Sequence, residues 1–203
     1  MRLEPHDANN NGTLGDVYRS LGRWDESARL YETAIRLDPL DPVWHSHLRR
    51  VRYLTGRLRE AEAQARKVLQ ISPTYDGGHS ALGFVLLAQG ELDAAVAEMQ
   101  QESGEERGLG LVVVYHASGR RAESDAALSR FSREHAQDAA KDIALAYGYR
   151  EELDEAFAWL DRAYRQKDAD LWNIKPVQVD PLMKAFVLDP RFTTFLRKMN
   201  LPE

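Results

Sequence analysis

The sequence predicts an all-α protein in which about five helical hairpins stack side by side into a solenoid. Three observations predict it. Glycines recur at a fixed interval, prolines recur at the same interval, and the apolar residues between them follow the period of an α-helix. No stretch of the sequence shows sustained alternation of polar and apolar residues, so we predict no strands.

The turn residues set the interval. The glycines, 34 residues apart and then 29, are Gly22, Gly56, Gly90 and Gly119. The prolines, 34 residues apart, are Pro5, Pro39 and Pro73. A glycine adopts positive φ and lets one helix end and the chain reverse, whereas a proline stops the next helix from fusing to the last. Each unit is therefore expected to run helix, turn, helix, stop.

The first hairpin, residues 8–41, shows the helical period most clearly. Its first helix carries apolar side chains at i, i+4 and i+7, namely Leu14, Tyr18 and Leu21. Its second helix continues the pattern with Trp24, Leu30, Tyr31, Ala34 and Leu37. Asp25 and Glu26 fall in the first turn of that second helix, where negative charge suits the helix dipole. We therefore predict two amphipathic helices here.

The later hairpins each depart from the first in one respect. In the third, the segment "QQESGEERG" replaces the helix end and proline and removes five residues from the interval. In the fourth, "LGLVVVY" is the only run with strand-like composition, and it stands where a helix is due. The fifth lacks the turn glycine. We still predict helical hairpins in all three places, because the apolar period continues through them.

These positions resemble the tetratricopeptide repeat, whose 34-residue signature is W-x2-L-G-x2-Y followed by A-x3-F, A and P. The matching residues in the five repeats are Leu14, Gly15, Tyr18, Gly22, Tyr31, Ala34 and Pro39; Leu48, Gly56, Ala61, Ala65, Val68 and Pro73; Leu82, Gly83, Leu86, Gly90, Ala95 and Met99; Leu111, Tyr115, Gly119 and Leu128; and Ile143, Ala144, Tyr147, Ala156, Leu160 and Ala163. The resemblance covers residues 1 to 167 and implies a right-handed α-solenoid, with residues 8–167 as the repeat array. It also implies that the motif residues pack one hairpin on the next.

Residues 168–203 follow a different pattern. Asp180-Pro181 and Asp189-Pro190 each predict an N-cap followed by proline at the first helical position. The apolar residues of the two short helices expected here are Leu182, Met183 and Phe186, then Phe192, Phe195, Leu196 and Met199. Such a pair would cap the open end of the solenoid. A second possibility is that it folds back and fills the apolar half of the concave side.

The same ending is similar to a tail, "DPLxxDPRFxxLLRRMGLP", found on bacterial tetratricopeptide proteins. The matching residues are Asp189, Pro190, Arg191, Phe192, Leu196, Met199, Leu201 and Pro202, whereas Val187, Leu188, Thr193 and Thr194 depart from the commonest wording. The resemblance implies a regulatory part of a bacterial signalling protein.

Residues 1–7 match the end of a preceding repeat, because Leu3 and Pro5 occupy its last positions. We therefore expect the chain to be a fragment or short relative of a longer array. The alternative is an ordinary start with an extended leader.

The composition excludes several classes of protein. The net charge of −5 gives no global attraction to nucleic acid or to anionic membranes. The longest apolar run, residues 109–115, is too short to cross a bilayer. The absence of cysteine excludes a disulfide, a thiolate metal site and a thiol nucleophile. It also fits a reducing, cytoplasmic location, with a periplasmic one left open.

The sequence predicts no catalytic residue, no metal site and no cofactor. His45, Ser46 and His47 are adjacent, but adjacent side chains on a helix point about 100° apart, so adjacency makes neither histidine a base for that serine. His79 could approach His45 and His47 across neighbouring helices, yet no carboxylate or cysteine completes a ligand set. We therefore predict a protein that is not an enzyme.

In the family that the sequence resembles, the first helix of each hairpin lines a concave groove. The residues expected there are Asp16, Arg19, His47, Arg50, Tyr53, Phe84, Leu87, Val113, His116, Leu145 and Tyr149. This groove would be polar and charged toward the N-terminus and apolar toward the C-terminus. We expect it to bind a protein or peptide partner in an extended or helical conformation. The rival hypotheses are a sensory domain that binds a small ligand in the same groove and an arm for self-association into a homo-oligomer.

Two departures from the family pattern concern the first two repeats. Arg49 and Arg52 stand where the family uses a small glycine and a packing tyrosine, so they predict either a contact with an anion or an ion pair with Asp16 or Glu60. The lysine- and asparagine-based carboxylate clamp of the chaperone-binding relatives is not reproduced, since Gly12, Asp16 and His47 hold its positions. Docking of chaperones by that route is not expected.

Overall fold

The computed structural model describes residues 7–168, 171, 174, 177, 180 and 182–201. Among them it contains twelve α-helices and no strand, which confirms the all-α prediction. The helices are α1 (Ala8–Ser20), α2 (Trp24–Leu37), α3 (Pro42–Leu54), α4 (Leu58–Ile71), α5 (Gly78–Gln89), α6 (Leu92–Gln101), α7 (Gly104–Ala117), α8 (Arg121–His135), α9 (Ala140–Tyr149), α10 (Leu153–Gln166), α11 (Lys184–Leu188) and α12 (Pro190–Lys198).

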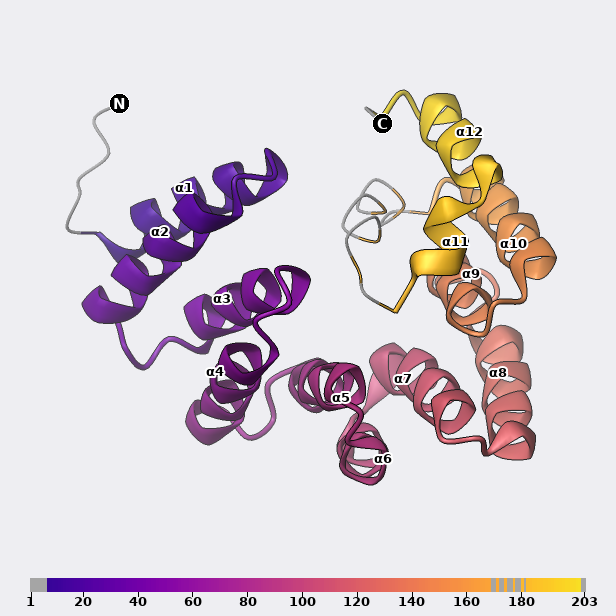
Figure 1. The fold of residues 1–203 in the computed structure, drawn as a ribbon, viewed down its shortest axis with the longest axis horizontal. Coiled ribbons are helices and arrows are strands. Elements are labelled where there is room, and N and C mark those ends of the chain that lie inside the picture. The colour runs from indigo at the N-terminus through magenta and orange to yellow at the C-terminus, as the bar shows by residue number, and fades with distance from the viewer. Residues whose placement is uncertain are drawn as a thin grey trace.

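The first ten helices form five antiparallel hairpins that follow one another around a crescent (Figure 1). The first helices of the later hairpins, α3, α5, α7 and α9, lie on the inner side of the crescent, and their partners lie outside (Figure 1). Helices α11 and α12 lie beside α9 and α10 at the end of the array (Figure 1). This is the tetratricopeptide-type solenoid that the sequence predicts.

The turn glycines hold the conformation expected of them. Their φ angles are 70° for Gly22, 73° for Gly56, 84° for Gly90 and 70° for Gly119. At the equivalent place in the fifth hairpin, Glu151 adopts φ of 59°, a left-handed conformation that costs a side-chain-bearing residue free energy. The turn geometry is therefore the same in all five hairpins, although the fifth has no glycine.

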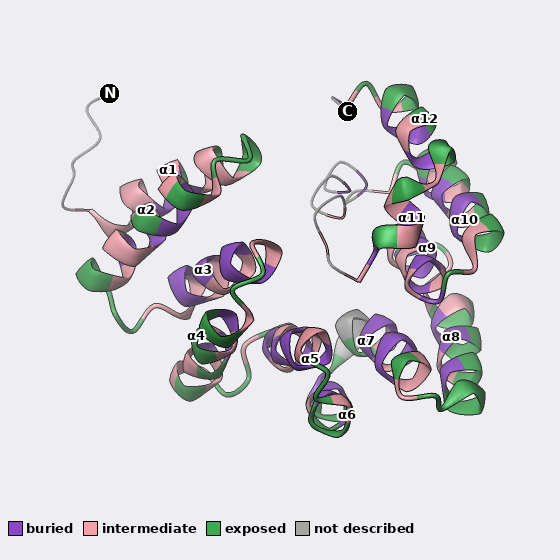
Figure 2. Cartoon of the chain, viewed as in Figure 1, coloured by how far each residue is buried: buried purple, intermediate pink, exposed green. Residues whose placement is uncertain are grey.

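The core lies between the two helices of each hairpin and between neighbouring hairpins, where the buried faces meet (Figure 2). Met99 of α6 is fully buried against α5 and α7. A Cβ atom at Gly83 would lie 2.8 Å from its methyl carbon, so a larger residue there would displace the Met99 side chain. The strand-like run of the fourth hairpin is helical within α7, with Val112 and Val114 fully buried. Burial against neighbouring helices thus overrides local β-propensity.

The inner helices of the C-terminal half also touch one another. Helix α7 contacts both α5 and α9, in addition to its partner α8. Apolar side chains on the inner face of this half are consequently drawn into the interfaces between helices. This packing changes the composition of the concave surface, as described below.

The C-terminal helices correct one expectation and support another. Helix α11 begins at Lys184, so Asp180 is not its N-cap and Leu182 and Met183 precede it. The carboxylate of Asp180 accepts from the Leu182 amide and from side chains of α3 and α9, while Pro181 lies outside the described residues. Helix α12 begins as predicted, because the Asp189 carboxylate accepts from the Arg191 amide at 2.9 Å.

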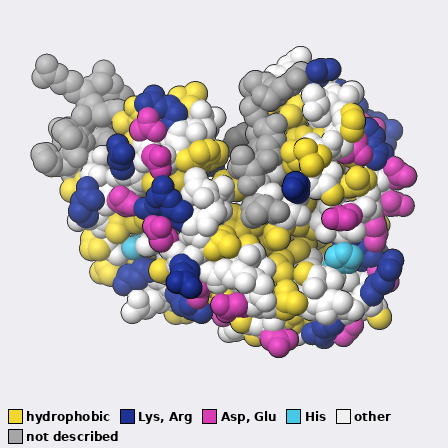
Figure 3. Space-filling view, viewed as in Figure 1, with side chains coloured by type: hydrophobic (Ala, Val, Ile, Leu, Met, Phe, Trp, Pro, Cys, Tyr) yellow, Lys and Arg dark blue, Asp and Glu magenta, His cyan; other side chains and the backbone are white. Residues whose placement is uncertain are grey.

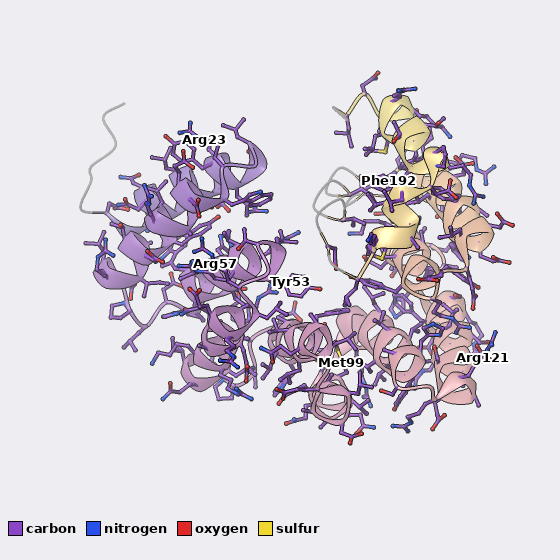
Figure 4. All side chains as sticks on the ribbon, in the orientation of Figure 1. Arg23, Tyr53, Arg57, Met99, Arg121 and Phe192 are labelled. Carbon is purple, nitrogen blue, oxygen red and sulfur yellow. The ribbon has the colours of Figure 1, made fainter. Side chains whose placement is uncertain are left out.

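The C-terminal pair covers the apolar end of the fifth hairpin. Phe186 of α11 stacks on Phe157 of α10 at 5.0 Å between ring centroids, and it meets Phe192 of α12 edge-on at 5.2 Å. Figure 4 labels Phe192, which lies where α12 meets α11. The predicted cap is therefore present.

At the other end, α1 starts at Ala8, and the Asp7 carboxylate accepts from the Asn10 amide at 2.9 Å. The prediction that Leu3 and Pro5 end a preceding repeat concerns residues outside the described part of the chain, as does the predicted match at Pro202.

Candidate functional site

The concave side of the crescent contains an open hollow of about 440 Å³. Figure 3 shows this hollow between the two arms of the molecule, with hydrophobic side chains at its base. The residues around it come from α3, α5 and α9, from the stretch before α5, and from the segment before α11: Ser46, Arg49, Arg50, Tyr53, Leu54, Tyr75, Asp76, Gly77, Ser80, Ala81, Phe84, Lys141, Asp142, Leu145, Tyr149, Val177 and Asp180. We call this surface the groove.

Aromatic rings form the apolar part of the groove. Phe84 of α5 and Tyr149 of α9 stack with 5.8 Å between their ring centroids and 26° between their planes. This contact joins the third and fifth hairpins directly. Tyr53 projects from α3 toward the opening of the crescent (Figure 4), and its ring is packed with Ala61 and Val85. The three rings are thus fixed by the scaffold.

The carboxylate of Asp180 lies between two of these rings. Its Oδ1 accepts from the Tyr53 hydroxyl at 3.1 Å, and its Oδ2 accepts from the Tyr149 hydroxyl at 2.7 Å. The Leu182 amide donates to Oδ1 at 2.9 Å. Burial and the adjacent carboxylate raise the pKa of both tyrosines, so both hydroxyls keep their protons and donate.

The charged residues of the groove are of both signs. Its basic side chains are Arg49, Arg50 and Lys141, and its acidic ones are Asp76, Asp142 and Asp180. The Lys141 ammonium lies 3.4 Å from the Asp142 carboxylate. With Asp180 in place the formal charges of these described side chains balance.

Five of the eleven residues predicted for the concave surface line the groove. They are Arg50, Tyr53, Phe84, Leu145 and Tyr149. They come from the second, third and fifth hairpins, and the structure brings them together because the solenoid curves.

Three further predicted residues form a separate cluster where α1 meets α3. Asp16 accepts from Arg19 at 3.2 Å and from the Tyr31 hydroxyl at 2.7 Å, and His47 Nδ1 lies 3.2 Å from the same carboxylate. Burial raises the pKa of Tyr31 to about 12, and burial lowers the pKa of His47. This cluster joins the first two hairpins and does not line the groove.

The remaining three predicted residues also lie outside the groove. Leu87 and Val113 are only 7% and 4% exposed, because the inner helices α5 and α7 pack against each other there. These two are corrections to the predicted surface. His116 is half-buried in the last turn of α7 and is not among the lining residues.

Some groove residues were missed from the sequence. Tyr75 and Asp76 precede α5, where no helical register applies, and Lys141 lies in the first turn of α9. Asp180 was assigned to a helix cap. Only the Asp-Pro pair marked it as special, and that signal does not report a partner 127 residues away.

The contacts of Arg49, Arg52 and the histidines bear on the alternative roles that the sequence left open for them. Arg52 lies 3.3 Å from Glu60, as the ion-pair alternative predicted, and it is also paired with Glu32, which was not predicted. Arg49 lines the groove. His45 contacts Gln64 at 2.7 Å and His79 contacts Glu98 at 2.7 Å, so each meets the second helix of its own hairpin.

The described residues form neither a recognisable metal site nor a membrane span. No group of three or more His, Cys, Asp or Glu side chains among them is arranged to hold a metal ion. Of the helices described, none is long and apolar enough to span a membrane.

Comparison with known proteins agrees with the stacked helical hairpins of the structure. A family model described as "Tetratricopeptide repeat" matches residues 13–76, within the first two hairpins. A tetratricopeptide repeat-containing thioredoxin of Arabidopsis thaliana, TTL4, is 31% identical over 81 residues, which cover 40% of this chain. The matched region spans only 12% of the length of that plant protein.

Solved structures show the same fold. TTC0263, a tetratricopeptide repeat protein of Thermus thermophilus, aligns with a TM-score of 0.64 at 24% identity, over 85% of this chain and 98% of that one. PilF of Pseudomonas aeruginosa aligns with a TM-score of 0.61 at 16% identity, over 95% and 91%. YrrB, described as having an unusual peptide-binding site, aligns with a TM-score of 0.54 at 17% identity, over 95% and 93%.

Proposed function

Because the chain is a tetratricopeptide repeat protein, we propose that it is a non-enzymatic interaction module whose groove binds a peptide segment of a partner protein. The observation that carries the proposal is the groove itself, an open hollow lined by aromatic rings and by charged side chains of both signs. A surface that combines an apolar strip with charged neighbours is typical of peptide recognition. YrrB, which shares the fold, is described as binding peptide at an unusual site.

The shape of the groove favours a chain segment as its ligand. The hollow is open along the concave side rather than enclosed. An enclosed apolar cavity is what most small-molecule sites provide. A peptide in an extended or helical conformation can lie across α3, α5 and α9 and contact Phe84, Leu145 and the neighbouring arginines together. The proposed role is regulatory, supported by the resemblance of residues 189–202 to tails of bacterial signalling proteins.

The test begins with peptides selected from a random display library on the immobilised full chain. Dissociation constants of the selected peptides are then measured by fluorescence polarisation for the wild type and two variants. Phe84→Glu places a charge on the aromatic base of the groove, and we expect at least tenfold weaker binding. Ala94→Glu places the same charge on an exposed position of α6 in the same hairpin, and we expect binding within twofold of wild type.

Equal weakening by the two variants, or no effect of Phe84→Glu, would place binding elsewhere and refute the proposal. Light scattering of the same samples tests self-association. A change of mass caused by Phe84→Glu would support the homo-oligomeric arm in place of the peptide module.

A further inference from the structure

In the structure the groove already holds a carboxylate, which belongs to the chain itself. Both oxygens of Asp180 are engaged by tyrosine hydroxyls, from α3 at 3.1 Å and from α9 at 2.7 Å. Tyr53 lies 127 residues from Asp180 in the sequence, so this contact depends on the curvature of the solenoid and on no local turn. A carboxylate that accepts one hydrogen bond at each oxygen, from two different hydroxyl groups, has well-defined positions for both of its oxygens.

The donors are set in place by packing that does not involve Asp180. Tyr53 is 6% exposed and packs in the cluster with Ala61 and Val85. Tyr149 is held by its stacked contact with Phe84. Two hydroxyl groups whose rings are fixed by neighbouring helices form a preorganised pair of hydrogen-bond donors. A carboxylate binds to such a pair with little loss of side-chain entropy in the protein.

Charge gives the second argument. Among the described residues that line the groove, three side chains are basic, Arg49, Arg50 and Lys141, and Asp180 is one of three acidic ones. When Asp180 is withdrawn, these described residues together carry a net positive formal charge. The surface that remains is therefore complementary to another carboxylate.

We propose that Asp180 occupies the place of an acidic ligand, and that the partner peptide inserts an aspartate or glutamate side chain between Tyr53 and Tyr149 in its stead. The inference rests on the proposed function and names the chemistry of its ligand. It also implies competition within the chain. The apparent affinity of the groove is lowered by the fraction of molecules in which Asp180 is bound, so removing Asp180 raises that affinity.

The experiment uses the full chain and two synthetic peptides as probes. One has the sequence VQVDPLM of residues 177–183, with fluorescein at its N-terminus and an amidated C-terminus, so that aspartate supplies the only carboxylate of the peptide itself and the label is common to both probes. The other carries asparagine at that position. We expect the Asp180→Ala variant to bind the aspartate peptide at least tenfold more tightly than the asparagine peptide, and at least fivefold more tightly than the wild type does.

Matched tyrosine variants identify the site. In the Asp180→Ala background, Tyr149→Phe removes one donor and retains the ring that stacks on Phe84, so we expect at least fivefold weaker binding of the aspartate peptide. Tyr115→Phe removes a hydroxyl that meets Gln100 outside the groove and should change affinity less than twofold. Asp180→Asn, which preserves the size of the side chain, repeats the comparison if Asp180→Ala alters the circular dichroism spectrum.

Three results would overturn the inference. In the first the two peptides bind equally, in the second both Asp180 variants fail to bind either peptide, and in the third Tyr149→Phe leaves binding unchanged. If library peptides still bind in a manner that depends on Phe84, the inference fails while the proposed function stands. If no peptide binding depends on Phe84, both fail.

Discussion

The turn between the two helices of each hairpin can be tested by opposite substitutions in two different hairpins. Gly56 and Glu151 occupy equivalent positions, with φ of 73° and 59°. A Cβ atom added at Gly56 would have no described atom within 4 Å, so the substitution Gly56→Ala changes backbone energy without a steric clash. Glu151→Gly makes the opposite change in the fifth hairpin.

Two opposing effects determine how much each substitution changes the free energy of unfolding. A left-handed conformation costs a residue with a Cβ atom about 1–2 kcal/mol. Replacing glycine by alanine returns about 0.4–1 kcal/mol, because the unfolded chain then has less conformational freedom. We therefore expect Gly56→Ala to lower the free energy of unfolding by about 1 kcal/mol. By the same terms, we expect Glu151→Gly to raise it by about 0.5–1 kcal/mol.

The assay is urea unfolding, followed by far-UV circular dichroism and by tryptophan fluorescence, which must give coincident transitions. With an m value of about 2.5 kcal/mol/M, the midpoint should fall by roughly 0.4 M for Gly56→Ala and rise by roughly 0.2–0.4 M for Glu151→Gly. Gly22→Ala, at φ of 70° and also without a described atom within 4 Å, should repeat the first result. A neutral Gly56→Ala together with a destabilising Glu151→Gly would refute the reasoning.

Three other predictions concern the core, a helix cap and alkaline pH. Met99→Ala removes a fully buried side chain from the largest core cluster and should lower the free energy of unfolding by about 3 kcal/mol, measured by urea unfolding. Asp189→Ala removes the N-cap of α12 and should cost about 1 kcal/mol, measured the same way. The pKa of Tyr31 is raised to about 12 in the folded chain, above its ordinary value near 10. The protonated Tyr31 hydroxyl therefore stabilises the folded chain fully below about pH 10, and this stabilisation is lost as the pH rises from about 10 toward 12. The thermal midpoint should fall less steeply over that range in Tyr31→Phe than in the wild type; equal slopes would contradict the assignment.

The hairpins could be predicted because their signals are local. A turn glycine, a stopping proline and an apolar period each act within one hairpin, so the five units and their order follow from the sequence. The strand-like run in α7 was correctly assigned by its place in the repeat rather than by its composition. Propensity alone would have failed there, since Val112 and Val114 are surrounded by neighbouring helices.

The candidate site could be predicted only in part. The resemblance to the repeat family identified Tyr53, Phe84 and Tyr149, because in that family one face of each first helix lines the groove. It failed for Leu87 and Val113, because register does not tell how closely adjacent inner helices approach each other. That distance depends on the curvature of the whole array.

Asp180 could not be found in this way. Its partners are in the second and fifth hairpins, and no local pattern joins them. The Asp-Pro pair is compatible with a helix cap, which explains the incorrect start assigned to α11. The position of such a residue depends on the path of the chain after the last repeat.

The link from Asp180 to Tyr53 also limits how this protein could change in length. Most arrays of this kind can gain or lose a unit, because each hairpin touches only its neighbours. Here the Tyr53 hydroxyl of α3 and the Asp180 carboxylate of the segment before α11 lie 3.1 Å apart across the arc. Duplicating or deleting a hairpin between them would rotate and displace α3, and the two groups would no longer meet. The number of units between α3 and the C-terminal segment therefore decides whether Asp180 can reach Tyr53.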